Sequence, residues 1–281
     1  MQLSVRAHDL SVQGGEALIG ALKKSGADGL QLVCYKSFAD VRHTPNGIDE
    51  ARALSIGNAL SLANIPVVLL GAYFNPVHSD PAKVQDGMAI FSDYLRYGAA
   101  LGCNIVGSET GSRSDEPWVY HPDNRTETSL SLVVERFFSL CKTAAQYGAF
   151  VGIEGAAGHV CWNIATLQKA YERIGCENLR IIFDLYNYLD RANCRDYYDL
   201  LCEGLETFGD RICCFHLKDC VFENGGFRQV PLGRGELDYD RIIGAIRKHN
   251  ENATLIMEGT TGGDIPYGAA YIRKKWREAT L

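Results

Sequence analysis

Four polar residues of this chain each follow an apolar run, and their side chains could together hold a metal ion. They are Glu154, Asp184, His216 and Glu258. In sequence order they are 30, 32 and 42 positions apart. A strand, a crossover helix and two loops occupy about 30 residues or more, so each residue would end one strand of a repeating unit. Three carboxylates and one imidazole meeting at one place would form a divalent-metal site.

The elements that must position these side chains follow a regular alternation. The predicted strands cover residues 3–8, 29–35, 66–71, 104–109, 150–154, 179–184, 212–219 and 254–258. Helical patterns lie between them, and no linker or low-complexity break interrupts the chain. This predicts an α/β fold, a (β/α)8 barrel, as one domain over residues 1–281. The carboxyl ends of barrel strands converge on one mouth, which would bring the four residues together.

Composition restricts the partners that we expect. The chain has 281 residues, 46% of them hydrophobic and 22% charged, which is typical of a globular protein. No apolar run reaches the roughly 20 residues that cross a membrane, and the net charge of −6 disfavours nucleic acid. The ten cysteines include no Cys-x-x-Cys pair, and the N-terminus lacks a signal-peptide core. We therefore expect a cytoplasmic protein with a small-molecule substrate and neither a membrane nor a nucleic-acid partner.

The four residues also admit structural roles. Taken alone, Glu154, Asp184 or Glu258 could equally form a buried salt bridge or cap the next helix. Their equivalent positions at strand ends favour a shared metal ion. Because the set contains no cysteine, a structural zinc site is disfavoured. The chain also lacks Gly-x-Gly-x-x-Gly after its first strand, which disfavours a dinucleotide cofactor.

Further polar residues at predicted strand ends are candidates for substrate contact. They are His8, Glu109, His159 and Lys218. Lys218 could neutralise a developing negative charge, or it could form a structural ion pair with Asp219 or Glu154. The segment 231–235, Pro-Leu-Gly-Arg-Gly, could bind a phosphate. A tight turn ahead of the helix that starts near Asp238 is the favoured interpretation.

Several motifs together resemble the xylose isomerase-like barrels, and most closely the sugar phosphate isomerases/epimerases. The motifs are Ile153-Glu154, Phe183-Asp184, His-Leu-Lys-Asp at 216–219, Pro-Leu-Gly-Arg-Gly-Glu-Leu-Asp at 231–238, Met257-Glu258 and the stretch 106–111. The resemblance implies a TIM barrel that binds one divalent metal ion per chain through Glu154, Asp184, His216 and Glu258. Mn²⁺ is favoured, and Mg²⁺, Co²⁺ or Zn²⁺ is compatible. It also implies that Glu154 and Glu258 act as paired acid and base.

This resemblance implies an isomerase or epimerase that acts on a small sugar, sugar phosphate or related polyhydroxy carbonyl compound. A metal-bound carbonyl would stabilise the enediolate that forms when a carboxylate removes the α-proton. Two positions depart from the family pattern. Asn187 stands where many relatives have a histidine near the substrate, and Phe222 stands where ketohexose epimerases have an arginine. Asn187 is still expected to contact substrate, whereas 3-epimerisation of free ketohexoses is less expected.

Three alternatives remain open at this stage. The first is a lyase that dehydrates an inosose or a dehydroshikimate-like ring, because it would use the same proton abstraction. The second is an enzyme like the abasic-site endonucleases, disfavoured by the acidic charge. The third is a non-catalytic binding barrel, disfavoured because all four ligands are present. A homo-oligomer is left open.

Overall fold

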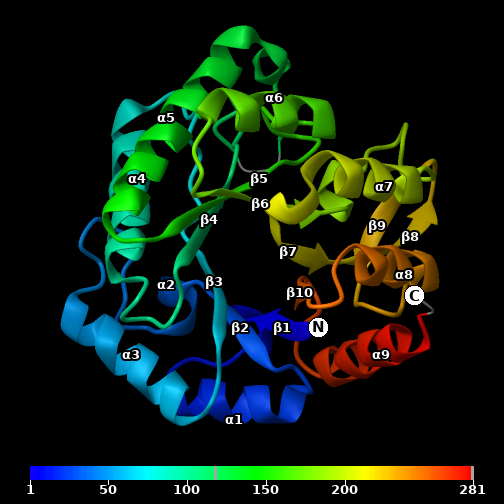
Figure 1. Ribbon diagram of the computed structural model, residues 1–281, viewed down its shortest axis with the longest axis horizontal. Coiled ribbons are helices and arrows are strands. Elements are labelled where there is room, and N and C mark those ends of the chain that lie inside the picture. The colour runs from blue at the N-terminus through cyan, green and yellow to red at the C-terminus, as the bar shows by residue number, and fades with distance from the viewer. Residues whose placement is uncertain (117–118, 280–281) are drawn as a thin grey trace.

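Eight parallel strands close into a barrel in this computed structural model, which describes residues 1–116 and 119–279. The ring order is β1-β10-β7-β6-β5-β4-β3-β2 (Figure 1). The strands are β1 (Gln2–Arg6), β2 (Gly29–Leu32), β3 (Val67–Gly71), β4 (Ile105–Glu109), β5 (Phe150–Glu154), β6 (Leu179–Asp184), β7 (Ile212–Leu217) and β10 (Thr254–Met257). The predicted (β/α)8 barrel is thereby confirmed.

Helices form the outer layer of the ring (Figure 1). They are α1 (Gly15–Ser25), α3 (Glu50–Leu62), α4 (Pro81–Tyr97), α5 (Glu127–Gln146), α6 (Ile164–Ile174), α7 (Tyr197–Phe208), α8 (Tyr239–His249) and α9 (Asp264–Glu278). Short helical turns stand in the loops: α2 (Cys34–Ser37), η1 (Ala7–Leu10), η2 (Pro122–Arg125), η3 (Tyr186–Tyr188) and η4 (Gly209–Arg211). Several helix starts carry a capping side chain, such as Asp80 before Pro81 and Asp238 before Tyr239. No helix in the described ranges has the length and apolar character that a membrane span requires.

The barrel interior has an apolar floor beneath the strand ends. A small cluster of Leu69, Ile182, Cys214 and Ile256 fills it. Two glycines make room for Ile182, because a Cβ on Gly107 or Gly152 would lie 2.4 or 2.8 Å from Ile182 Cδ1. Alternate residues of a strand share one face. Asp184, His216 and Glu258 therefore point the same way as the floor residues two positions before them, one layer higher.

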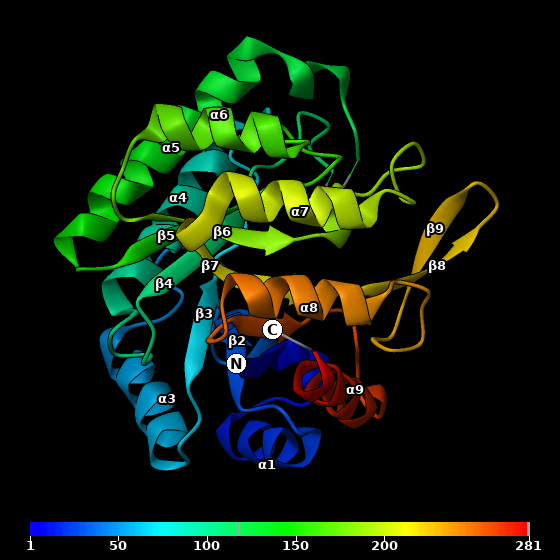
Figure 2. The same ribbon diagram turned by 45° about the vertical axis from the view of Figure 1, so that its right-hand side comes forward.

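An antiparallel hairpin follows β7 and was not predicted. Its strands are β8 (Asp219–Glu223) and β9 (Gly226–Val230), where no strand is predicted between residues 219 and 254. Asn224 and Gly225 join them with φ of 51° and 70°. Two positive φ values mark the tight hairpin turn for which Asn-Gly is the preferred sequence. The hairpin projects from the barrel beside α7 and α8 (Figure 2).

Candidate functional site

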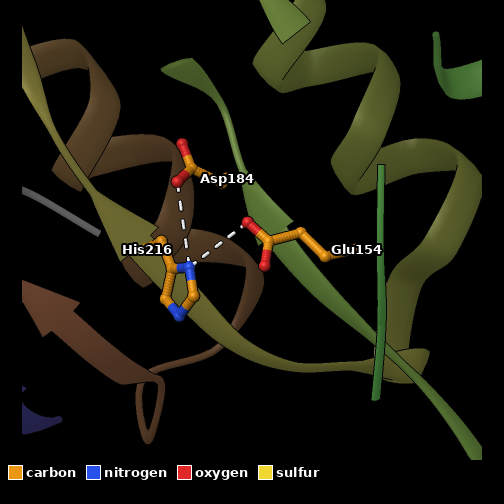
Figure 3. Close-up of side chains that lie close together, drawn as sticks. All are labelled: Glu154, Asp184 and His216. Carbon is orange, nitrogen blue, oxygen red and sulfur yellow. Dashed lines mark ion pairs between the residues drawn. The ribbon is translucent and has the colours of Figure 1, made fainter. Parts of the chain in front are cut away.

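The four residues singled out from the sequence meet around one ring nitrogen. His216 Nδ1 lies 3.4 Å from Glu154 Oε1, 3.8 Å from Asp184 Oδ2 and 3.0 Å from Glu258 Oε2. One ligand atom from each of Glu154, Asp184 and His216 falls within 4.8 Å of the others. Figure 3 shows these three side chains pointing toward one another from β5, β6 and β7. Glu258 joins them from the residue after β10.

The chemistry of this cluster fits a divalent cation. Glu154, Asp184 and His216 are buried, and neither ring nitrogen of His216 has a hydrogen-bond partner among the described residues. Burial alone would lower the pKa of His216, but the charges of Glu154 and Glu258 outweigh it and raise the pKa to about 10. The cluster therefore strongly favours a cation at its centre. Carboxylate oxygens with one imidazole nitrogen are suitable ligands for a hard or borderline divalent metal ion.

Lys218 and Asn187 connect the carboxylates of the cluster. Lys218 Nζ lies 2.8 Å from Asp184 Oδ2 and 2.9 Å from Glu258 Oε1, and it donates to Asn187 Oδ1 at 2.7 Å. Asn187 Nδ2 in turn donates to Glu154 Oε1 at 2.7 Å. Lys218 therefore forms ion pairs with Asp184 and Glu258, whereas Asp219 or Glu154 was the partner considered from the sequence.

Arg6, at the end of β1, belongs to the same cluster and was missed in the sequence. Its Nη1 donates to Glu258 Oε1 at 2.8 Å, while Nε and Nη2 bind the two oxygens of Asp9 at 2.8 and 3.0 Å. Asp9 also accepts a bond from the Gly259 amide at 3.1 Å. Arg6 and Glu258 are 252 positions apart, so no local pattern could have paired them.

A pocket of about 600 Å³ opens over the cluster. The residues predicted to contact substrate all line it, and these are His8, Glu109, His159, Asn187 and Lys218. Glu258 and Arg6 line it as well, together with Tyr186 and Gln229, which the sequence did not point to. The pocket walls therefore contain both the predicted contacts and one side of the candidate metal centre.

Two titratable groups on the pocket wall have strongly shifted pKa values. Burial and the neighbouring charge of Glu154 raise the pKa of Glu109 well above its usual range. Burial lowers the pKa of His159 to about 4. His159 Nε2 lies 3.9 Å from Glu109 Oε2. At neutral pH the wall thus presents a neutral imidazole beside a carboxyl group that tends to keep its proton.

The Gly-rich segment after the hairpin binds a carboxylate of the chain itself. Asp219 Oδ2 accepts bonds from the amides of Gly233 and Gly235 at 3.0 and 2.9 Å. Asp219 Oδ1 accepts from the Cys220 amide at 2.9 Å and from the Leu237 amide at 3.4 Å. These amides are the groups that would bind a phosphate, and Asp219 already uses them. The segment is a turn, as the favoured interpretation held.

Comparison with known proteins agrees with this architecture. A family model described as the xylose isomerase-like TIM barrel matches residues 19–277. The chain belongs to this family. Since the match covers nearly the whole chain, the family resemblance seen in the sequence motifs is confirmed. A search of curated protein sequences gives no match.

Solved structures of the same architecture superpose over almost the full length of both chains. One is the IOLI protein with a bound zinc atom, with TM-score 0.72, 14% identity and coverage of 99% of this chain and 96% of that chain. Another is the 3-keto-D-glucoside 4-epimerase YcjR from E. coli, with TM-score 0.74, 14% identity and coverage of 98% and 99%. A third is D-psicose 3-epimerase with D-fructose, with TM-score 0.69, 19% identity and coverage of 99% and 96%. At these identities the likeness shows the fold alone.

Proposed function

We propose that the chain is a single catalytic barrel, a metal-dependent isomerase or epimerase of a small sugar or related polyhydroxy carbonyl compound. The observation that carries the proposal is the convergence of three carboxylates on His216 Nδ1 at the base of an open pocket. The epimerase activities named for YcjR and D-psicose 3-epimerase, on the same fold, support it.

Glu154, Asp184, His216 and Glu258 would hold the ion, with Mn²⁺ favoured and other divalent ions compatible. When bound, a divalent cation would polarise a substrate carbonyl and stabilise the negative charge of an enediolate. Glu154 and Glu258 lie on strands three steps apart in the ring, so they approach this centre from different sides. One would take the α-proton and the other would return a proton elsewhere, with substrate between them.

The groups around the two glutamates fix their orientation. Asn187 holds Glu154 Oε1, while Arg6 and Lys218 hold Glu258 Oε1. Glu258 has a pKa well below its usual range because the charges of Lys218, His216 and Arg6 outweigh its desolvation.

A lyase that acts through the same proton abstraction is the second candidate. Glu109 is the observation that favours it, because its carboxyl group lies in the pocket near His159 and its pKa is raised. Such an acid could protonate a departing hydroxyl group. Release of water and formation of an unsaturated product would distinguish this reaction from isomerisation.

The deciding experiment measures metal content and proton exchange together. Purified protein should carry about one divalent ion per chain, and it should exchange the α-proton of a carbonyl substrate in deuterated water, assayed over a panel of sugars and sugar acids. Glu154→Gln with excess metal should lose exchange by about a hundredfold or more, the scale of a general base. Glu135→Gln, on the exposed face of α5, is the control. Near-normal exchange in the Glu154→Gln variant with its metal site filled would show that Glu154 is only a metal ligand and not the general base.

A further inference from the structure

The pocket has an acidic side and a basic side. Glu109 on β4 and Glu258 after β10 are its acidic lining residues, and Glu258 joins the carboxylates that end β5 and β6 around His216. The segments after β1 and β2 contribute His8, Tyr35 and Lys36. β1 is the ring neighbour of β10, whereas β2 lies one strand farther from Glu258. In the strand order, β2 stands four steps from β6 in either direction. Lys36 therefore enters from the strand directly opposite the one that carries Asp184.

Lys36 differs from the other two strong cations that line the pocket. Arg6 is bonded to Asp9 and Glu258, and Lys218 to Asp184 and Glu258. In the part of the chain that the structure describes, Lys36 Nζ has neither a hydrogen bond nor an ion pair, and its one close partner is the Tyr35 ring, 5.9 Å away. Its backbone is fixed in α2, where the Lys36 amide donates to Val33 O at 3.1 Å. Among the described residues, this turn thus presents an exposed ammonium group without an ion-pair partner.

His8 lines the same pocket as Lys36 and lies close enough to be influenced by its charge. Burial and the charges of Arg6 and Lys36 lower its pKa to about 4. Its buried Nδ1 has no hydrogen-bond partner among the described residues. A neutral imidazole has one ring N–H group. That group can donate a hydrogen bond to an anion that is held by the nearby ammonium group.

The place where barrels often bind phosphate does not serve that purpose here. It lies in the loops after the seventh and eighth strands, and in this chain Asp219 occupies its amides at Gly233 and Gly235. A second anion there would face a buried carboxylate.

From this asymmetry we infer that the pocket binds an anionic group of its substrate, a carboxylate or a phosphate, at Lys36 with Tyr35 and His8 beside it. The inference rests on the proposed function, because it orients a substrate whose reacting carbonyl lies at the metal centre. The substrate class is then an anionic sugar derivative with its charge remote from the reacting carbons. A cavity of about 600 Å³ has room for both ends.

Matched substrate pairs test this assignment with metal-loaded protein. Each pair compares an uncharged sugar with its 6-phosphate or with the corresponding uronic acid, by α-proton exchange in deuterated water. We expect kcat/KM to favour an anionic member by about tenfold or more, the scale of a hydrogen bond to a charged group. Lys36→Gln should raise KM for that member by a similar factor and leave kcat unchanged. Lys36→Arg should restore KM, and Lys24→Gln, on the exposed face of α1, should behave as wild type.

A binding measurement separates this inference from the proposed function. Inorganic phosphate and acetate are titrated calorimetrically into the metal-loaded protein and into Lys36→Gln, because anion bound at the metal survives that substitution. Weaker binding in Lys36→Gln supports the subsite even if no panel sugar exchanges a proton, an outcome that would overturn the proposed function. Equal binding, or exchange that is indifferent to charge and to Lys36, overturns the subsite and leaves the proposed function standing.

Discussion

Glu258 is the most heavily charge-compensated residue of the site. Three cationic groups contact its two oxygens: Arg6 at 2.8 Å, Lys218 at 2.9 Å and His216 at 3.0 Å. Arg6 is itself held by both oxygens of Asp9. Arg6 therefore acts through Glu258 and is a positioning residue, with its guanidinium locked in place before any ligand arrives.

We predict that Arg6→Met weakens metal binding by about tenfold to a hundredfold, as removal of a partner behind a metal ligand generally does. Competition with a chromophoric chelator would measure the affinity. Arg52→Met is the matched control, since Arg52 forms its ion pair with the exposed Asp40 on the outside of the barrel. Equal affinity in Arg6→Met and wild type would mean that Lys218 and His216 alone hold Glu258 in position.

The turn after the hairpin depends on a glycine at one position. A Cβ on Gly235 would lie 2.0 Å from Asp219 Oδ1 and 2.5 Å from the Cys220 carbonyl oxygen. The residue before Asp219 is Lys218, whose carbonyl accepts a bond from Tyr239 at 2.8 Å. Displacement of Asp219 would therefore disturb the backbone that carries Lys218 into the pocket.

Two glycine substitutions test this element. Gly235→Ala should lower the free energy of unfolding by about 1–3 kcal/mol, the usual result of overpacking a filled site. Gly244→Ala in α8, where a Cβ would meet no atom within 4 Å, should raise it by about 0.5–1 kcal/mol. Urea denaturation of both variants measures the difference. A Gly235→Ala protein as stable as wild type would show that the turn adjusts easily.

The hairpin of β8 and β9 is an element that was not predicted from the sequence. Its Asn224-Gly225 pair is a recognisable turn signal, but the flanking strands are short and only half-buried, so hydrophobic alternation is weak. The hairpin contributes to the pocket through contacts with residues that are distant in the sequence. Phe227 packs against Tyr186 with ring centroids 5.2 Å apart, and Gln229 Nε2 donates to Glu258 O at 3.4 Å. Contacts of that kind have no signature in local sequence.

At the scale of the molecule, the alternation of strands and helices was predictable because each buried strand reads as a continuous apolar run. The four candidate ligands were also visible, because each follows an apolar run and they recur at about the spacing of one strand-helix unit. Arg6 was not visible, since its partner arrives from the other end of the chain. The pairing of Arg6 with Glu258 depends on the closure of the barrel between its first and last strands. The periodic pattern of apolar residues in the sequence does not encode that closure.

Removal of metal should lower the stability of the whole barrel. A ligand that binds only the folded state, at a hundred times its Kd, adds about 2.7 kcal/mol. For a chain of this size we expect EDTA to lower Tm by about 5 °C or more, and excess Mn²⁺ to restore it. Scanning calorimetry of wild type and His216→Ala would measure this. A Tm indifferent to EDTA in a protein shown to contain metal would place the ion outside the folded core.

The closure of β1 against β10 has a consequence for the order of events during folding. Glu154, Asp184 and His216 lie on consecutive neighbours in the ring, so a growing chain possesses them before β10 is made. Glu258 and its anchor Arg6 meet only where the first and last strands pair, with Gln2 opposite Thr254 and Val5 opposite Met257. An ion that requires all four ligands is therefore retained only after the two ends of the chain have met. The appearance of tight metal binding during refolding would then report the step at which the barrel closes.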